Sequence, residues 1–183
     1  EEIFMFSLKT DRDIFSNFEI RANIVTNLGK LPNLNESYLS FLVRFKGMEI
    51  TPDVIIYGYE DSLNENRYLE NNYSECSKVF WMIGYSGQGD GWFINKLDGS
   101  IFFYDHDSGD YQIDNFMSLR INFLEFLQLS LLYRELERYL DLNNGIIDEI
   151  SQKQFEDTVN SIHDNLFSSY PYRYFDTKTT SNS

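Results

Sequence analysis

The feature that most constrains this fold is the continuous stretch 83–110, which combines two strand-forming runs, a turn signal and a polar end. Residues 92–95 and 101–104 are rich in aromatic and β-branched side chains. The Asp98-Gly99 dipeptide between them is a favoured two-residue turn, because Gly accepts a positive φ. We therefore expect a hairpin with the pairs Asn95–Phe102, Phe93–Tyr104 and Trp92–Asp105. Both of its faces carry large apolar groups, so the hairpin belongs inside a larger sheet.

Two helices are expected before the strands. Residues 18–28 have apolar side chains four apart (Ile20, Ile24, Leu28), and Gly29 follows as a C-terminal stop. Asn35 can cap a second helix, whose apolar stripe runs through Tyr38, Leu39, Phe41, Leu42 and Phe45.

Strands are expected at 54–59 and 79–83, where short β-type runs are apolar on both sides. The residues between them are polar. We expect a loop at 60–66 and a surface crossing at 67–78, with at most a helical turn. Residues 117–121 are expected to be extended.

Two further helices follow the strands. Asn122 and Glu125 form a capping-box pattern at the start of the longest helix, which ends at Asn143-Asn144-Gly145. A weaker amphipathic helix is expected at 151–167, with Phe155, Val159, Ile162 and Leu166 on one side.

The order of the elements indicates the fold class. Helices, then a run of strands, then helices is typical of an α+β domain with an antiparallel sheet and N-terminal and C-terminal helices packed on it. A chain of 183 residues without an internal repeat or linker fits one domain, which we place at 1–176. The polar tail 177–183 is expected to be disordered.

Net charge limits the possible partners. With 29 acidic and 15 basic residues the chain carries a charge of −14, which repels phosphate backbones and anionic lipids. Direct binding to nucleic acid or membrane is therefore not expected, whereas a basic protein partner suits this charge. The alternative is that the negative charge only keeps the protein soluble. Aromatic residues make up 17% of the chain, more than a small core hides, so some rings should lie on a binding surface. The lone Cys76 and the lack of a long apolar run favour a cytoplasmic location.

Catalytic motifs are incomplete in this sequence. The segment around Ser86 lacks the last glycine of a nucleophile elbow, and the glycines at 87–91 have the wrong spacing for a dinucleotide loop. Cys76 has no histidine near it in sequence. Asp105, His106 and Asp107 could form a metal site of a metal-dependent enzyme, although they do not fit an EF-hand. We otherwise predict no enzyme activity, no metal and no cofactor.

Four pieces of the chain, in order, resemble the SMI1/KNR4 family, also called the SUKH superfamily. Together they span about 19–141, so that 142–176 would be a C-terminal helical extension. They are Leu31-Pro32 with Tyr38, Phe41-Leu42 and Gly47; Ile83-Gly84 with Gly87 and Gly89-Asp90; Gly99 with Ile101, Phe102, Phe103 and His106-Asp107; and the helix start Asn122-Phe123-Leu124-Glu125-Phe126-Leu127.

The resemblance implies an α+β fold and, as in bacterial members, an immunity protein that neutralises a polymorphic toxin by stoichiometric binding. Such toxins are often nucleases, which are commonly basic. The eukaryotic members imply an intracellular scaffold or regulator as the alternative. Carboxylates would steer the partner and rings would anchor it, and the predicted contact residues are Asp90, Trp92, Tyr104, Asp105, Asp107, Asp110 and Tyr111. For Trp92 and Tyr104 the alternative is burial within the sheet.

Overall fold

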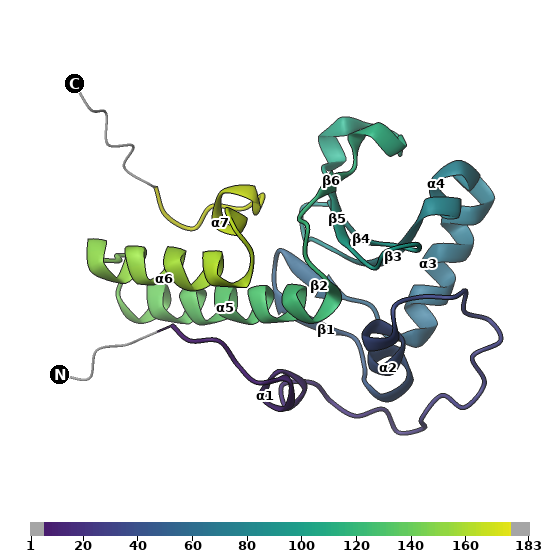
Figure 1. Cartoon of the computed structure of the whole chain (residues 1–183), viewed down its shortest axis with the longest axis horizontal. Helices are drawn as coiled ribbons and strands as arrows, with labels where there is room; N and C mark the ends of the chain where they lie inside the picture. The colour runs from purple at the N-terminus through teal and green to yellow at the C-terminus, as the bar shows by residue number, and fades with distance from the viewer. Residues whose placement is uncertain (1–5, 177–183) are drawn as a thin grey trace.

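A computed structural model describes residues 6–176, and its centre is a six-stranded antiparallel sheet (Figure 1). The strands follow one another in sequence order across the sheet, which confirms the expected α+β class. They are β1 (Met48–Thr51), β2 (Val54–Ile56), β3 (Phe80–Tyr85), β4 (Gly91–Asn95), β5 (Ile101–Tyr104) and β6 (Met117–Ser118). The predicted disordered tail lies outside the described residues.

The first face of the sheet carries the larger core. Trp92 and Ile94 of β4 point into it, because alternate residues of a strand share a face. Helices from both ends of the sequence supply the other side of this core (Figure 1). They are α1 (Asp11–Phe15), α2 (Glu36–Arg44), α5 (Phe123–Leu142), α6 (Glu149–Ile162) and α7 (Leu166–Ser169).

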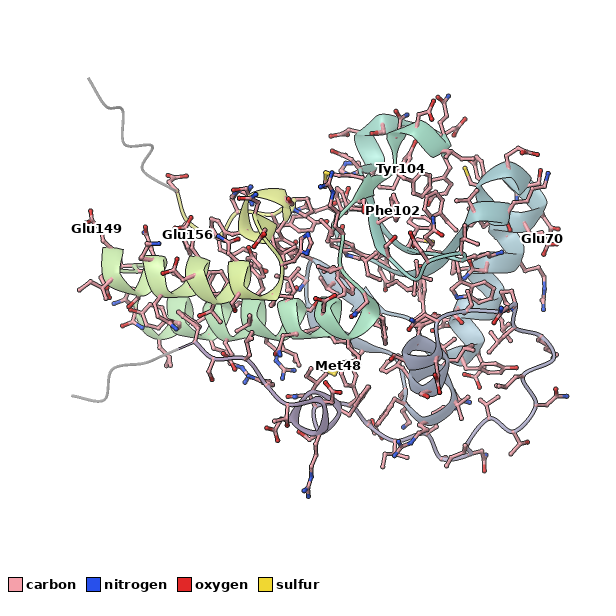
Figure 2. All side chains as sticks on the ribbon, viewed as in Figure 1. Met48, Glu70, Phe102, Tyr104, Glu149 and Glu156 are labelled. Atoms are coloured by element: carbon pink, nitrogen blue, oxygen red, sulfur yellow. The ribbon has the colours of Figure 1, made fainter. Side chains whose placement is uncertain are left out.

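The second face carries a smaller core around Phe93 and Tyr104. Its cover consists of α3 (Tyr59–Asn72), α4 (Ser74–Val79) and the connection from β5 to β6. That connection holds two short 3₁₀ turns, η1 (His106–Ser108) and η2 (Ile113–Asn115). Figure 2 shows Tyr104 on the side of the sheet where this connection lies.

The hairpin exists, but its predicted register is wrong by two residues. Trp92 pairs with Phe103, and Phe93 pairs with Phe102. The connection is longer than an Asp-Gly turn because the Asn95 side chain accepts hydrogen bonds from the backbone N–H groups of Leu97 and Asp98. Gly99, with φ 76°, then returns the chain to β5. A shift of two residues keeps every side chain on its expected face.

The helix predicted at 18–28 is wrong. This segment has no helix and lies beside the end of α2, where backbone N–H groups of Arg21 and Val25 donate to the carbonyls of Arg44 and Val43. Ile24 is 55% exposed, so the four-residue spacing does not mark a buried stripe. The Asn17 side chain, which precedes the segment, donates back to the carbonyls of Asp13 and Ile14 and does not cap it, and external backbone partners favour the extended conformation.

The loop predicted at 60–66 and the surface crossing at 67–78 are also wrong, since both segments are helical. α3 is mostly polar because one side alone, with Ser62, Asn66 and Leu69, is buried. The Asn66 side chain accepts from the Met82 N–H at 2.7 Å and donates to the Met82 carbonyl at 2.9 Å. It therefore takes the place of a strand partner where β2 has ended.

The C-terminal helices largely agree with their predictions. The capping box of Asn122 and Glu125 is present at the start of α5, and α5 ends at Leu142 with Asn143 as its C-cap. The helix predicted at 151–167 is two helices, because Asn165 adopts a left-handed conformation with φ 60° between them. Leu166 and Tyr170 still reach the first core. Among residues 6–176 no helix has the length and apolar character required to cross a membrane.

Replacing Asn66 by Ala should lower the free energy of unfolding by about 2 kcal/mol, because the buried Met82 N–H and carbonyl lose their partner. Asn72→Ala on the same helix is the matched control. Its side chain is exposed and donates only to the Tyr68 carbonyl, so the change should stay within about 0.5 kcal/mol. Urea unfolding of the three proteins measures both values. Equal effects of the two substitutions would show that the hydrogen bonds of Asn66 to the Met82 backbone do not stabilise the fold.

Candidate functional site

Two predicted contact residues, Trp92 and Tyr104, are buried in the two cores. Trp92 is fully buried against Phe103 and Phe126, and its Nε1 donates to the Asp53 carbonyl at 2.9 Å. Tyr104 is 2% exposed, and its hydroxyl donates to the Asp110 carbonyl. No partner can reach these rings in this conformation, because both strand faces are covered by the protein's own segments.

Asp90 was also predicted as a contact residue, but its carboxylate is buried and fully used inside the protein. Oδ1 accepts from the backbone N–H of His106 at 3.0 Å and lies 2.6 Å from His106 Nδ1. Oδ2 accepts from the hydroxyls of Ser86 at 3.0 Å and Tyr172 at 2.6 Å. Burial opposes ionisation, yet these donors together hold the pKa of Asp90 below its usual value. Asp90 is therefore a structural anchor.

The remaining four predicted residues lie at the surface, on the connection after β5. The side chains of Asp105 and Asp107 are 56% and 84% exposed and flank His106 in the η1 turn. Asp110 is exposed and Tyr111 is half-buried. Binding by these four residues stays a prediction.

The structure does not group Asp105, His106 and Asp107 as the sequence analysis proposed for a metal site. Single ligand atoms of Asp90, Asp105 and His106 lie within 4.8 Å of one another, so Asp90 takes the place of Asp107. The Asp90 oxygens already accept from four groups, as described above, and a cation would have to displace some of them. This set suits a hydrogen-bonded anchor better than a metal centre.

A group of partly exposed tyrosines, which includes Tyr111, lies beside Asp110. The rings of Tyr57 and Tyr85 stack at 5.3 Å, and those of Tyr73 and Tyr111 meet edge-on at 5.0 Å. We call this group the tyrosine face; its members are Tyr57, Tyr68, Tyr73, Tyr85 and Tyr111. Tyr68 and Tyr85 are 57% and 37% exposed, which leaves ring surface available for a partner.

Carboxylates border the tyrosine face on one flank of α3. Asp61, Glu65 and Tyr68 are spaced by four and three residues, so they share that flank. Burial, then the charge of Glu65 and its neighbours, raises the pKa of Tyr57. Burial raises the pKa of Tyr111 to about 12, with Tyr73 and Glu65 contributing. The negative charge of Glu65 therefore acts on both tyrosines, and the surface is both aromatic and acidic.

A hollow of about 280 Å³ opens within this surface. Asp110 accepts a hydrogen bond from the Tyr73 hydroxyl at 3.3 Å at its side. No lysine or arginine occurs among the described residues that line the hollow, which are Tyr68, Tyr73, Gly89, Gly91, Tyr104, His106, Gly109, Asp110 and Tyr111. His106, whose pKa is raised by its hydrogen bond to Asp90, is the one titratable base among these described residues. A cationic side chain of a partner would meet the aromatic rings and the carboxylate of Asp110 there.

The sequence analysis did not identify the contribution of α3. Tyr57, Asp61, Glu65, Tyr68 and Tyr73 fall in or next to segments that were predicted as loop or surface crossing. The spacing Asp61, Glu65, Tyr68, Asn72 was the available signal, because it places acidic and aromatic side chains on one helical flank.

The comparisons with known proteins add little to this geometry. No family model matches the chain, and no solved structure matches it. The uncharacterized protein RP478 of Rickettsia prowazekii is 35% identical over 81 residues. The match covers 43% of this chain and 14% of that relative, so the chain spans a small part of the length of the relative.

The Asp90–His106 contact should show in the pH dependence of the protein. The hydrogen bond that His106 donates to the Asp90 carboxylate raises the pKa of His106. The stability that this contact adds is therefore complete below about pH 6.5 and is lost as the pH rises through the raised pKa. Because the pKa of Asp90 is lowered in the folded protein, the ionised carboxylate stabilises the fold, and this stability is lost when the pH falls through the lowered pKa. Asp90→Asn should therefore lower the pKa of His106.

Proton NMR titration measures this pKa, and a His163→Gln variant assigns the two histidine signals. Asp141→Asn, which removes an exposed carboxylate at the end of α5, serves as the charge-matched control. An unchanged His106 pKa in Asp90→Asn would contradict the contact.

Proposed function

We propose that this chain is an immunity-type binding protein that neutralises a cognate toxin domain, a basic nuclease, by direct stoichiometric binding. The observation that carries the proposal is the tyrosine face with its border of carboxylates. Exposed tyrosines are typical anchors of protein interfaces, and a surface with several carboxylates favours a cationic partner. The resemblance to the SMI1/KNR4 family supplies the toxin as the kind of partner.

The hollow is the expected centre of the interface. A lysine or arginine of the toxin enters it, stacks on Tyr68 or Tyr111 and pairs with Asp110. Glu65 and Asp61 then act at the rim, where they raise the association rate more than the affinity. Blocking the toxin requires no chemistry by this chain, because a bound protein of this size covers an active site or its substrate channel.

An intracellular scaffold or regulator would use the same tyrosine face, and the partner distinguishes the two functions. A metal-dependent enzyme is the third candidate, and it would require the oxygens of Asp90 to leave His106, Ser86 and Tyr172. Stoichiometric zinc or magnesium, lost on replacing Asp105 by Ala, would favour this third function.

The test uses the purified C-terminal domain of the protein encoded next to this chain. Calorimetry should give one-to-one binding whose affinity falls as salt rises, and the toxin activity should be lost in the complex. Absence of binding at low salt would contradict the toxin function.

Substitutions locate the surface. Tyr68→Ala should weaken binding roughly tenfold, or ~1.4 kcal/mol, because an exposed anchor ring is removed. Glu65→Gln should mainly slow association and reduce the salt dependence. Asp141→Asn removes the same charge at the far end of α5 and should leave the affinity and the association rate unchanged. If all three variants bind like the unmodified protein, the tyrosine face is not the interface.

A further inference from the structure

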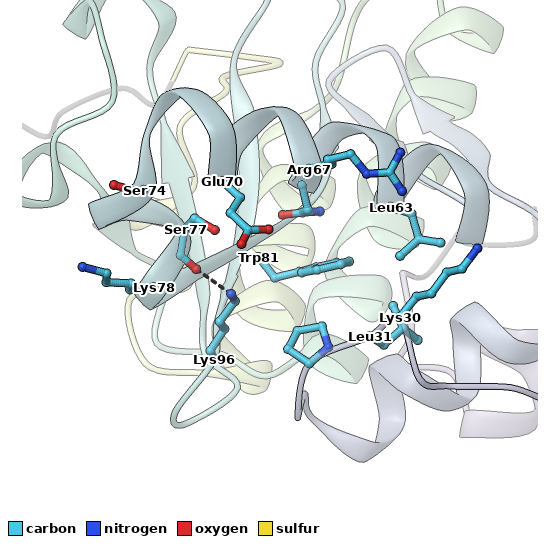
Figure 3. A pocket seen from close by; sticks show the side chains of 12 residues that line it. Lys30, Leu31, Leu63, Arg67, Glu70, Ser74, Ser77, Lys78, Trp81 and Lys96 are labelled. Carbon is cyan, nitrogen blue, oxygen red and sulfur yellow. Dashed lines mark hydrogen bonds between the residues drawn. The ribbon is translucent and has the colours of Figure 1, made fainter.

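A second pocket lies on the other flank of α3, away from the tyrosine face. It has a volume of about 460 Å³, which is within the range of small-molecule sites. Trp81 of β3 forms its floor (Figure 3). Its walls come from α3, α4, the segment before α2 and the turn between β4 and β5. They are Lys30, Leu31, Pro32, Leu63, Asn66, Arg67, Glu70, Ser74, Ser77, Lys78 and Lys96.

The charge of this pocket is opposite to that of the whole chain. Four cationic side chains and one carboxylate, Glu70, line it, although acidic residues outnumber basic ones 29 to 15 in the sequence. Within residues 6–176, Lys30 and Arg67 form no ion pair. Lys78 pairs with exposed Glu75 at 2.7 Å. The Lys96 ammonium donates to the Ser77 carbonyl, which leaves its charge without a carboxylate in contact.

Burial lowers the pKa of Lys96, while the charge of Glu70 acts in the opposite direction. The Lys96 ammonium also lies 6.0 Å from the centre of the Trp81 ring. Lys30, Arg67 and Lys78 are exposed at the rim of the pocket, whereas Lys96 is half-buried. Like charges that lie near one another repel, and an anion bound among them would relieve this repulsion. The lining therefore carries more positive than negative charge, and an anionic ligand would balance the excess.

The walls also indicate the shape of the anion. Apolar groups of Leu31, Pro32 and Leu63 lie beside Trp81, which is 6% exposed. The hydroxyls of Ser74 and Ser77 are available as donors at the end of the pocket that holds Lys78 and Lys96 (Figure 3). Arg67 and Lys30 lie at the other end, beside Leu63 and Leu31. One face of a ligand would thus meet cations and hydroxyls, and another would meet apolar surface.

We propose that this pocket binds a small phosphorylated molecule with an apolar or planar part. A phosphate monoester carries about −1.5 to −2 charges and three acceptor oxygens at neutral pH, which matches several cations better than a single carboxylate does. Arg67 would bind phosphate oxygens in a bidentate manner, and the lysines would act as point charges. A polymeric nucleic acid does not fit, since the remaining surface is acidic.

The test titrates the full chain with ADP, pyrophosphate and adenosine as probes. Heteronuclear NMR follows the indole N–H signals of Trp81 and Trp92, and calorimetry gives the affinities. ADP and pyrophosphate should shift the Trp81 signal and leave that of Trp92, which is buried in the first core, unchanged. Adenosine should bind at least tenfold more weakly than ADP. Equal binding of adenosine and ADP, or no shift of Trp81 at millimolar ADP, would overturn the proposal.

Two variants test the assigned cations. Lys30→Gln and Arg67→Gln remove exposed side chains without ion pairs, so both should fold like the unmodified protein by circular dichroism. Each should weaken ADP binding about tenfold. Lys153→Gln removes a lysine from α6 and should have no effect. If Arg67→Gln and Lys30→Gln bind ADP as Lys153→Gln does, the probe binds elsewhere as an adventitious anion and the pocket has no such role.

Discussion

The buried carboxylate of Asp90 holds together three segments that are far apart in the sequence. Ser86 belongs to the turn between β3 and β4, His106 begins the η1 turn, and Tyr172 lies in the C-terminal segment after α7. Through His106 the carboxylate fixes the connection that carries Asp110 and Tyr111, and through Tyr172 it fixes the chain that closes the first core. A buried anion is stable only where donors surround it, and here four donors do so. One side chain therefore fixes both the segment that closes the first core and the connection that carries Asp110 and Tyr111.

The sequence predicted the parts of the fold that strong local signals determine. The capping box of Asn122 and Glu125, the hairpin strands and the class of the fold follow from local hydrogen bonding and from runs of β-type residues. Other parts depend on tertiary contacts. α3 is polar on most of its surface. Its Asn66 side chain binds the Met82 backbone of β3 beyond the end of β2, and no local sequence pattern predicts this contact. The segment 18–28 has helical spacing, but the end of α2 offers it backbone partners instead.

The sequence analysis located only some of the surface residues of the candidate site, because tertiary contacts decide which side chains are covered. Asp110 and Tyr111 lie on the surface next to the hairpin, as the sequence analysis expected. Trp92, Tyr104 and Asp90 do not, because hairpin residues of both faces are covered by helices and by the β5–β6 connection. The tyrosines of α3 and its flanking residues complete the surface, and they could be found only once α3 was known to be a helix. Aromatic content predicted that a ring-rich surface exists but not which rings form it.

The position of α3 gives the molecule a shared wall between two dissimilar cavities. With 100° between successive residues, Asp61, Glu65 and Tyr68 project to one side of the line through Ser62, Asn66 and Leu69, and Leu63, Arg67 and Glu70 project to the other. A ligand that tilts or slides this helix on one side necessarily alters the geometry on the opposite side. Thermodynamic linkage then requires that each ligand change the affinity for the other by the same factor. The two hydrogen bonds between Asn66 and Met82 would be the fixed point about which such a helix movement occurs.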